Sequence, residues 1–168
     1  MATNIQAIRE ISNPQRAYEY EVEVIGASSS GSFPLLTQKV RTVTIPQKSV
    51  ETFEINWKGR KVQHSGRDAS AKQVTVEFWS TEDRGAYSFF NDWINSINND
   101  EIGGGVTKDV YKGEVVIRTY ATDSSSVTGT NRLVNAWPSE LSDVSLDYTN
   151  SDAMVFSVTF TFDENYVE

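Results

Sequence analysis

The sequence contains no cysteine and a single histidine, His64, among its 168 residues. Without cysteine, disulfide bonds and thiolate chemistry are excluded. One histidine and no cysteine also leave too few ligands for a zinc site of the usual kind. The absence of cysteine fits synthesis inside the cell, and it equally fits a particle that has to work in any redox state.

Long apolar runs are missing as well. No stretch approaches the roughly 18 apolar residues of a membrane-spanning helix, and residues 1–20 lack the apolar core of a signal peptide. We therefore expect release into the cytoplasm and no membrane anchor. Acidic side chains outnumber basic ones, 23 to 15, which gives a net charge of -8. Because tight binding to phosphate backbones relies on Lys and Arg, we expect no specific nucleic-acid binding.

Strand patterns dominate what is present. Residues 18–25 alternate apolar and acidic side chains, which is typical of a half-buried strand with one face in solvent. The side chains expected to point inward are Tyr18, Tyr20, Val22 and Val24. The side chains expected to point outward are Glu19, Glu21 and Glu23.

Residues 38–45 and 50–57 carry two further strand patterns. We expect them to pair as one long hairpin, with its turn at residues 46–49, although Pro46 removes a hydrogen-bond donor there. The polar and basic segment 58–72 is expected to follow as a loop, with or without a short strand in it. Residues 74–78 then alternate again and predict another strand.

One segment has the periodicity of a helix. A single apolar stripe with a period of 3.6 residues predicts a helix over about residues 82–98. Ser80 and Asp83 resemble a capping box at its start, and the glycines at 103–105 end it. The stripe consists of Ala86, Phe89, Phe90, Trp93, Ile94 and Ile97.

Strand patterns return after the helix, over residues 110–121, 127–137, 143–148 and 153–163. In the last of these the side chains expected to point inward are Met154, Phe156, Val158, Phe160 and Phe162. Strands, one helix and more strands predict a mostly β fold, an antiparallel β-sandwich or barrel with one packed α-helix. The length fits a single domain, 1–168.

The residues offer no catalytic constellation. His64, Ser65 and Asp68 are close in sequence, but a catalytic triad needs such groups held at fixed angles by separate elements. Residues 103–105 follow the helix, so they end it and do not cradle a phosphate. Nothing singles out two carboxylates for a glycosidase. We therefore expect no enzymatic activity, no cofactor and no metal. Trp79, out of phase with its strand, either caps the helix or anchors a partner.

From residue 36 onward, the order and spacing of short motifs resemble the tail tube proteins of contractile-tailed bacteriophages, the myoviruses. The match covers residues 36–168, whereas residues 1–35, which supply the N-terminal strand and a variable Ser-rich loop, match less clearly. The motifs in chain order are Ile45-Pro46, Gly66, Val74-Thr75-Val76-Glu77, Phe90-Asn91-Asp92-Trp93, Ile102-Gly103-Gly104, Tyr111-Lys112, Tyr120-Ala121-Thr122-Asp123, Val127-Thr128, Trp137-Pro138, Leu146-Asp147 and Phe156-Ser157-Val158-Thr159-Phe160.

The resemblance implies a structural virion protein. It implies hexameric rings that stack into the inner tube of a contractile tail, the conduit for DNA ejection. The implied partners are further copies of the chain, the tail sheath protein, the baseplate or tube initiator, the tape measure protein and DNA passing through the lumen. The implied location is the phage tail, after synthesis in the host cytoplasm. Closing a barrel across subunits removes exposed strand edges, which agrees with the strand-rich sequence.

Three sets of surface residues follow as hypotheses. The expected hairpin turn is assigned to contact with the next ring: Pro46, Gln47, Lys48, Ser49 and Val50. The basic segment is either solvated or in contact with acidic strands of a neighbouring subunit: Lys58, Arg60, Lys61 and Arg67. The outer face of the helix is assigned to contact with the sheath: Asp83, Tyr87, Asn91 and Asp92.

Other functions remain open at this stage. The inner tube of a bacteriocin particle or secretion system, or a tube initiator, would share the fold and the logic of assembly. A monomeric β-sandwich that binds carbohydrate or protein would share only the fold class. A hydrolase would require an acid pair or a metal site. These classes differ in their assembly state, which is simple to measure.

Overall fold

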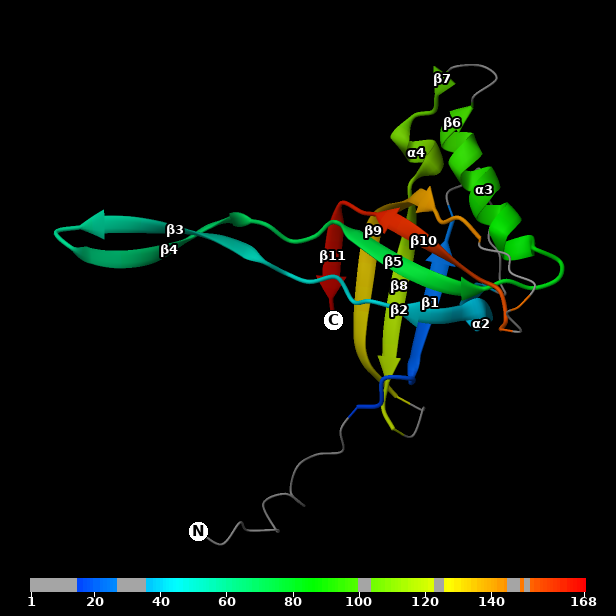
Figure 1. Ribbon diagram of the computed structural model, residues 1–168, viewed down its shortest axis with the longest axis horizontal. Helices are drawn as coiled ribbons and strands as arrows, with labels where there is room; N and C mark the ends of the chain where they lie inside the picture. The colour runs from blue at the N-terminus through cyan, green and yellow to red at the C-terminus, as the bar shows by residue number, and fades with distance from the viewer. Residues whose placement is uncertain (1–14, 27–35, 100–103, 123–125, 145–148, 150–151) are drawn as a thin grey trace, which may run out of the picture.

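In the computed structural model, strands from both ends of the chain form a body from which one long hairpin projects (Figure 1). The structure describes all residues except 1–14, 27–35, 100–103, 123–125, 145–148 and 150–151. The Ser-rich loop and most of the strand predicted over residues 143–148 therefore lie outside the described residues. None of the helices in the described ranges combines the length and apolar character that crossing a membrane requires.

One layer of the body consists of four antiparallel strands. β8 (Gly113–Tyr120) lies between β1 (Tyr20–Ile25) and β9 (Val127–Leu141), and β11 (Glu164–Val167) pairs with the other edge of β9. The inward side chains that this layer buries are Val22, Val24, Val115, Ile117 and Leu133.

The second layer is built around β5 (Gln73–Trp79). This strand pairs with β2 (Val40–Val43) on one side and with β10 (Val155–Thr161) on the other. β10 also pairs with residues 137–141 of β9, so β9 passes from one layer into the other. The prediction of a mostly β antiparallel sandwich is thereby confirmed. The alternation predicted for the last strand also holds, since Phe156, Val158, Phe160 and Phe162 are buried.

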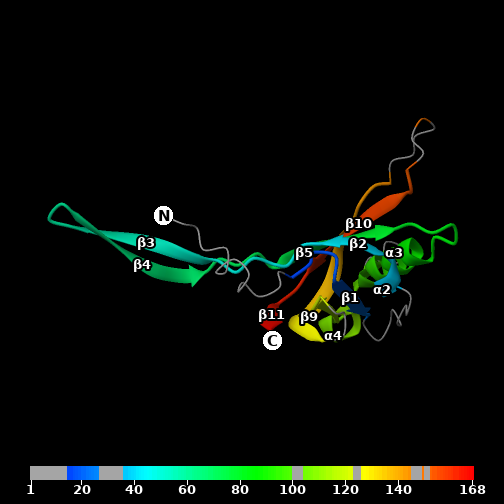
Figure 2. The ribbon, with the colours of Figure 1, turned by 90° about the horizontal axis from the view of Figure 1, so that it is seen from below.

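Helix α3 (Gly85–Ile97) covers one end of the sandwich (Figure 2). Phe90 packs against Phe78 and Phe160, with ring centroids 5.1 and 5.8 Å apart. Trp93 is fully buried, and its indole Nε1 donates a hydrogen bond to the carbonyl of Tyr111, 2.8 Å away. Each fully buried side chain of this size contributes about 1.5–3 kcal/mol, so the helix is held by its apolar stripe.

The start of α3 differs from the prediction. The helix begins at Gly85 and not near residue 82, and Ser80 does not cap it. Arg84 occupies the cap position with a left-handed φ of 50° and no side-chain cap hydrogen bond. The Asp83 carboxylate instead accepts a hydrogen bond from the Gly85 amide at 3.3 Å. A cap depends on the backbone angles at the entry to the helix, which residue types alone do not determine.

Short elements complete the described chain. They are α2 (Leu36–Lys39), α4 (Lys108–Tyr111), β6 (Asn98–Asn99) and β7 (Gly104–Gly105). None of them was predicted, because elements of two to four residues carry too little periodicity.

The predicted pairing of strands 38–45 and 50–57 is wrong. β2 joins the body through β5, whereas β3 (Val50–Trp57) pairs with β4 (Arg60–Asp68). The segment 58–72, predicted as a loop, therefore supplies a full strand. The turn is formed by Lys58 and Gly59, both with positive φ (47° and 77°). Two such residues form the type I′ turn whose twist matches a two-residue hairpin, so this turn competes successfully with the one at residues 46–49.

The start of the first strand also differs. Tyr18, predicted to point inward, is 69% exposed, and Glu19, predicted to point outward, is buried. β1 begins only at Tyr20, so the alternation of two residues per period does not apply to the turn before it.

Candidate assembly interface

The hairpin of β3 and β4, residues 50–68, is called the arm here. It extends away from the body in both views (Figures 1 and 2), and every residue in both strands is exposed. Eight residues of strand at roughly 3.3 Å each give a reach of about 26 Å. An isolated two-stranded ribbon is only marginally stable in water. The arm is therefore a segment that gains stability from a second surface.

The two faces of the arm differ sharply in chemistry. Residues paired directly across the strands share a face, so the register of β3 and β4 assigns each side chain. One face, the apolar face, consists of Phe53 with His64, Ile55 with Val62 and Trp57 with Arg60. The other face, the polar face, consists of Thr52 with Ser65, Glu54 with Gln63 and Asn56 with Lys61.

The charged side chains of the polar face pair with each other, whereas the side chains of the apolar face remain exposed to water. Lys61 pairs with Glu54 across the strands at 3.1 Å. On the apolar face Phe53, Ile55 and Val62 remain 48–52% exposed and Trp57 remains 69% exposed. Covering the exposed half of these four side chains would contribute on the order of 3–6 kcal/mol. An exposed apolar stripe of this kind marks a site of protein contact.

A bulge lies where the arm joins the body. Between the pairs Val50–Asp68 and Thr52–Ser65, two residues of β4 oppose Glu51 alone. Gly66 is one of the two, and a Cβ on it would lie 3.1 Å from the Cβ and carbonyl oxygen of Glu51. A bulge bends and twists a strand pair, so this one sets the direction in which the arm leaves the body.

Hydrogen bonds around Asp68 hold the root of the arm. Its Oδ1 accepts from the Ser70 amide at 2.9 Å, and the Ala69 amide donates to the Ser49 carbonyl at 2.9 Å. The pKa of Asp68 is lowered to about 2, chiefly by the hydrogen bonds from the Ser70 side chain and amide and further by Lys72. These hydrogen bonds hold the root of the arm in place, whereas both strands of the arm are exposed along their length.

The residues assigned to the hairpin turn lie at the root and not at the tip. Residues 46–49 lie between β2 and β3, and Val50 is the first residue of β3, so the prediction that residues 46–49 form the hairpin turn is wrong. They line a pocket of about 460 Å³ together with Asp68, Phe162 and Tyr166.

The basic set is divided between the two ends of the arm. Lys58 lies in the turn, Arg60 and Lys61 follow it at the tip, and Arg67 lies at the root. The structure therefore brings three of the four predicted basic residues together. The apolar residues that share this arm were not predicted as a functional surface, because the alternation of Phe53, Ile55 and Trp57 is also typical of an ordinary half-buried strand. The Lys58-Gly59 pair was the signal that could have revealed the turn.

The set assigned to the outer helix face is only partly on that face. Asp83 precedes the helix. Tyr87 is half-buried and meets Phe156 edge-on, with ring centroids 5.6 Å apart. Asn91 and Asp92 are exposed on α3.

The two layers present different outward faces. On the β1–β8–β9–β11 layer, Glu23 pairs with Arg118 at 2.8 Å and Glu114 pairs with Arg132, so the predicted acidic face is partly neutralised by neighbouring strands. The other layer presents hydroxyl groups together with the carboxylates of Glu77 and Glu140. The hydroxyl oxygens of Thr75 and Thr159 lie 3.2 Å apart across β5 and β10. The hydroxyl residues of this second face are Thr42, Thr75, Ser157, Thr159 and Thr161.

Trp79 lies at the edge of this hydroxyl face. It is 39% exposed, and the Arg41 guanidinium lies 5.0 Å from its ring centroid. Trp79 therefore does not cap the helix. Of the two alternatives, a cap over the helix and an exposed anchor for a partner, only the second is compatible with this exposed position.

His64, Ser65 and Asp68 do not form a catalytic triad. His64 stacks on Phe53 at the apolar face, whereas Ser65 points to the polar face and Asp68 bonds Ser70 at the root. The described ranges also contain no group of three or more His, Asp or Glu residues placed to hold a metal ion.

Comparison with known proteins gives a consistent result. The family model described as "Phage tail tube protein" matches residues 10–168. The tail tube protein gp19 of Enterobacteria phage T6 is 27% identical over 149 residues, which cover 87% of this chain and 86% of the relative. Its counterpart in Enterobacteria phage T4 is 26% identical over the same length and coverage.

Solved structures with the same fold come from contractile injection systems. The sheath/tube terminator of the extracellular contractile injection system PVC superposes with a TM-score of 0.70 at 21% identity, covering 94% of this chain and 99% of that one. A chain of the PVC sheath-tube complex has a TM-score of 0.67 at 20% identity, covering 100% and 99%. The tube-terminating cap of the anti-feeding prophage has a TM-score of 0.70 at 18% identity, covering 100% and 99%.

Proposed function

The chain belongs to the phage tail tube protein family, and from this premise we propose that it forms hexameric rings that stack into the inner tube of a contractile tail and conduct DNA during ejection. Its role in the virion is structural and not enzymatic. The proposed partners are other copies of the chain, the tail sheath, the baseplate or tube initiator and the tape measure protein. All of the chain, 1–168, is proposed to act as one tail-tube domain.

The exposed apolar face of the arm is the main observation that supports this proposal. Its apolar face, with Phe53, Ile55 and Trp57 about half exposed or more, has no cover within the described chain. A second copy supplies the missing surface, since head-to-tail contacts between identical subunits either close into rings or extend as stacks. We assign the arm, and with it Lys58, Arg60 and Lys61 at its tip, to the contact between successive rings. Pro46, Gln47, Lys48, Ser49, Val50 and Arg67 are assigned to the same contact at its root.

Free strand edges support closure within a ring. β2 is the outer edge of its layer, and residues 137–141 of β9 lie at the other end of that layer. Exposed edges promote pairing with another chain. Pairing β2 of one copy with this part of β9 in the next copy would join the layers side by side into a closed barrel.

The direction of the layers suggests which face meets DNA. The aromatic side chain of Phe90 on α3 packs against Phe78 and Phe160 of the β2–β5–β10 layer inside the sandwich. The exposed face of the helix and the outward face of this layer therefore point in opposite directions. With Asn91 and Asp92 of α3 toward the sheath, the hydroxyl-rich face lines the lumen. Short neutral hydroxyl side chains offer phosphates no cluster of cations, so DNA can slide past them.

The test is assembly of the purified full chain, followed by sedimentation and negative-stain electron microscopy. We expect hollow rings or tubes with six subunits per ring. A protein that stays monomeric at high concentration, even with a baseplate extract as nucleus, would contradict the proposal and favour a monomeric binding module.

A further inference from the structure

Glu19 is an acidic side chain that the fold buries without satisfying it. Its side chain is 7% exposed, and its Oε1 lies 3.8 Å from the guanidinium of Arg16. Its Oε2 has no hydrogen-bond partner among the described residues. The backbone is fixed on both sides, because the Glu19 amide donates to the Arg16 carbonyl and the Tyr120 amide donates to the Glu19 carbonyl. A buried carboxylate oxygen without a donor costs free energy, so a donor from another molecule would be stabilising here.

A pocket of about 460 Å³ opens beside this carboxylate. It lies between the edge strands of the two layers, with Tyr20 on one wall, Val43 and Ile45 on the other, and Ile117 between them. Arg16, Gln15, Thr44 and Thr119 also line this pocket, and the ion pair of Arg16 is with the Oε1 atom of Glu19. The apolar part of the lining and the unpartnered Oε2 match a side chain that has an apolar stem and a cationic head. Arginine fits best, because its planar guanidinium is weakly hydrated and bonds carboxylates in a fixed geometry.

Arg60 is a cation near the tip of the arm. It lies opposite Trp57 on the apolar face of the arm. Within the described ranges it makes no ion pair, whereas Lys61 on the polar face pairs with Glu54. When the apolar face docks on another copy, Arg60 enters the contact together with Trp57. A charge buried without a partner is strongly destabilising, so the docking surface must present an acid to Arg60.

We propose that Arg60 of one copy inserts into the Glu19 pocket of another copy and pairs with its carboxylate. This deepens the proposed function and rests on the arm acting between copies. One contact then satisfies two groups of opposite charge. A neighbouring hollow lined by Tyr18, Tyr20 and Tyr120 offers aromatic surface to Trp57 beside it.

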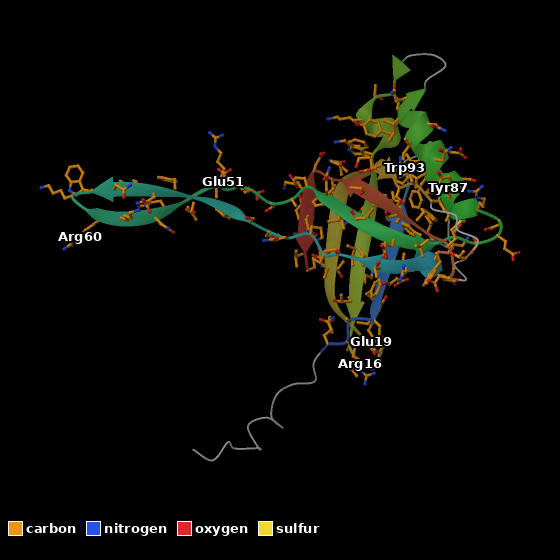
Figure 3. All side chains as sticks on the ribbon, viewed as in Figure 1. Arg16, Glu19, Glu51, Arg60, Tyr87 and Trp93 are labelled. Carbon is orange, nitrogen blue, oxygen red and sulfur yellow. The ribbon has the colours of Figure 1, made fainter. Side chains whose placement is uncertain are left out.

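The contact has to be made between copies. Figure 3 labels Arg60 at the far end of the arm and Glu19 at the lower end of the body, just before β1. The arm points away from its own body in both ribbon views (Figures 1 and 2). Arg60 therefore does not reach the Glu19 of its own chain.

A charge exchange tests the pair through tube formation by the full chain. Arg60→Glu and Glu19→Arg are each expected to raise the concentration for half-maximal tube formation at least roughly tenfold, since each places like charges in the contact. The double variant Glu19→Arg with Arg60→Glu is expected to restore tube formation. Sedimentation and negative-stain microscopy at constant ionic strength provide the measurement.

Two controls keep the test specific. Because Glu19→Arg changes a buried position, Glu19→Gln is measured beside it, and thermal unfolding of the unassembled fraction checks that the body is folded. Glu19→Arg combined with Lys61→Glu is the matched control, because Lys61 lies on the polar face of the arm, opposite Asn56, and not on the docking face. No restoration is expected from this combination.

The outcomes separate the contact from the proposed function. Normal tubes from Glu19→Gln and Arg60→Gln would overturn the contact and leave the tube role intact. A double charge exchange that remains as impaired as the worse single variant would overturn it as well. Failure of the unmodified chain to form rings or tubes under any condition would instead contradict the proposed function.

Discussion

Phe53 on β3 stacks on His64 of β4 with ring centroids 5.5 Å apart, on the face of the arm that no other described part of the chain covers. A stacked pair in water gains less than the same pair beneath a second surface, because the apolar area around it remains hydrated. The arm is thus built for a contact that the single chain does not provide.

Removing apolar side chains from this face is expected to prevent assembly without unfolding the body. Ile55→Ser and Trp57→Ala should each weaken tube formation by about 1–3 kcal/mol, which corresponds to roughly 5- to 150-fold in concentration. Sedimentation across a concentration series measures the change. Thr52→Ala on the polar face is the matched control and should leave tubes unchanged, and an equal effect of both substitutions would refute a one-sided contact.

Crowding the bulge is expected to misdirect the arm. Gly66→Val adds atoms where a Cβ already lies 3.1 Å from the Cβ and carbonyl oxygen of Glu51. We expect fewer tubes but an unchanged melting temperature of the body, because the bulge lies outside the core. Circular dichroism and electron microscopy measure these two quantities. Gly66 variants that assemble like the unmodified chain would show that the direction of the arm is set elsewhere.

The root of the arm is expected to loosen in acid. The pKa of Asp68 is about 2 in the folded chain, below its ordinary value of 3.8. A depressed pKa contributes stability above the unfolded value, and this stability is lost as the pH falls through the folded value.

We therefore expect the Ser70 amide, which donates to Asp68, to remain protected from hydrogen exchange at about pH 4.5 and to lose protection progressively towards about pH 2. Asp68→Ala should expose this amide at both values. Equal protection of this amide in the variant and in the unmodified chain would show that Asp68 does not stabilise the root of the arm.

The helix stripe is expected to dominate the stability of the body. Phe90→Ala removes a fully buried ring that packs on Phe78 and Phe160. It should lower the free energy of unfolding by about 3–5 kcal/mol. Asp92→Ala on the exposed side should change it by less than about 0.5 kcal/mol. Urea denaturation of unassembled protein compares the two, and similar losses would contradict the assigned orientation of the helix.

The exposed side of α3 is expected to bind the sheath. Asn91→Ala with Asp92→Arg should leave rings and tubes intact, because neither side chain is buried. Co-assembly with the tail sheath should be lost, since a reversed charge disrupts a complementary surface. Pelleting of preformed tubes with sheath protein measures this. Normal sheath binding by the variant would place the sheath contact on another surface.

Sequence patterns predicted which segments of the body form strands and the helix better than they predicted which strands pair with each other. The alternation in β5 and β10 predicted their buried faces, and the stripe through Phe90 and Trp93 predicted the helix. The same alternation in residues 50–57 predicted a strand but not that its partner is β4. A period of two residues identifies a strand's faces, whereas its hydrogen-bonding neighbour depends on turn geometry and on the whole topology.

The sequence by itself determined the fold class, the buried faces of β5 and of the helix, the lack of thiol chemistry and the family resemblance, because composition and periodicity are local properties of the chain. Tertiary structure decided that the apolar pattern of Phe53, Ile55 and Trp57 faces solvent on a projecting arm. It also decided that Glu19, on a pattern typical of exposed glutamates, lies buried beside a pocket. Burial is set by what the remaining chain places over a residue, and that is a non-local property.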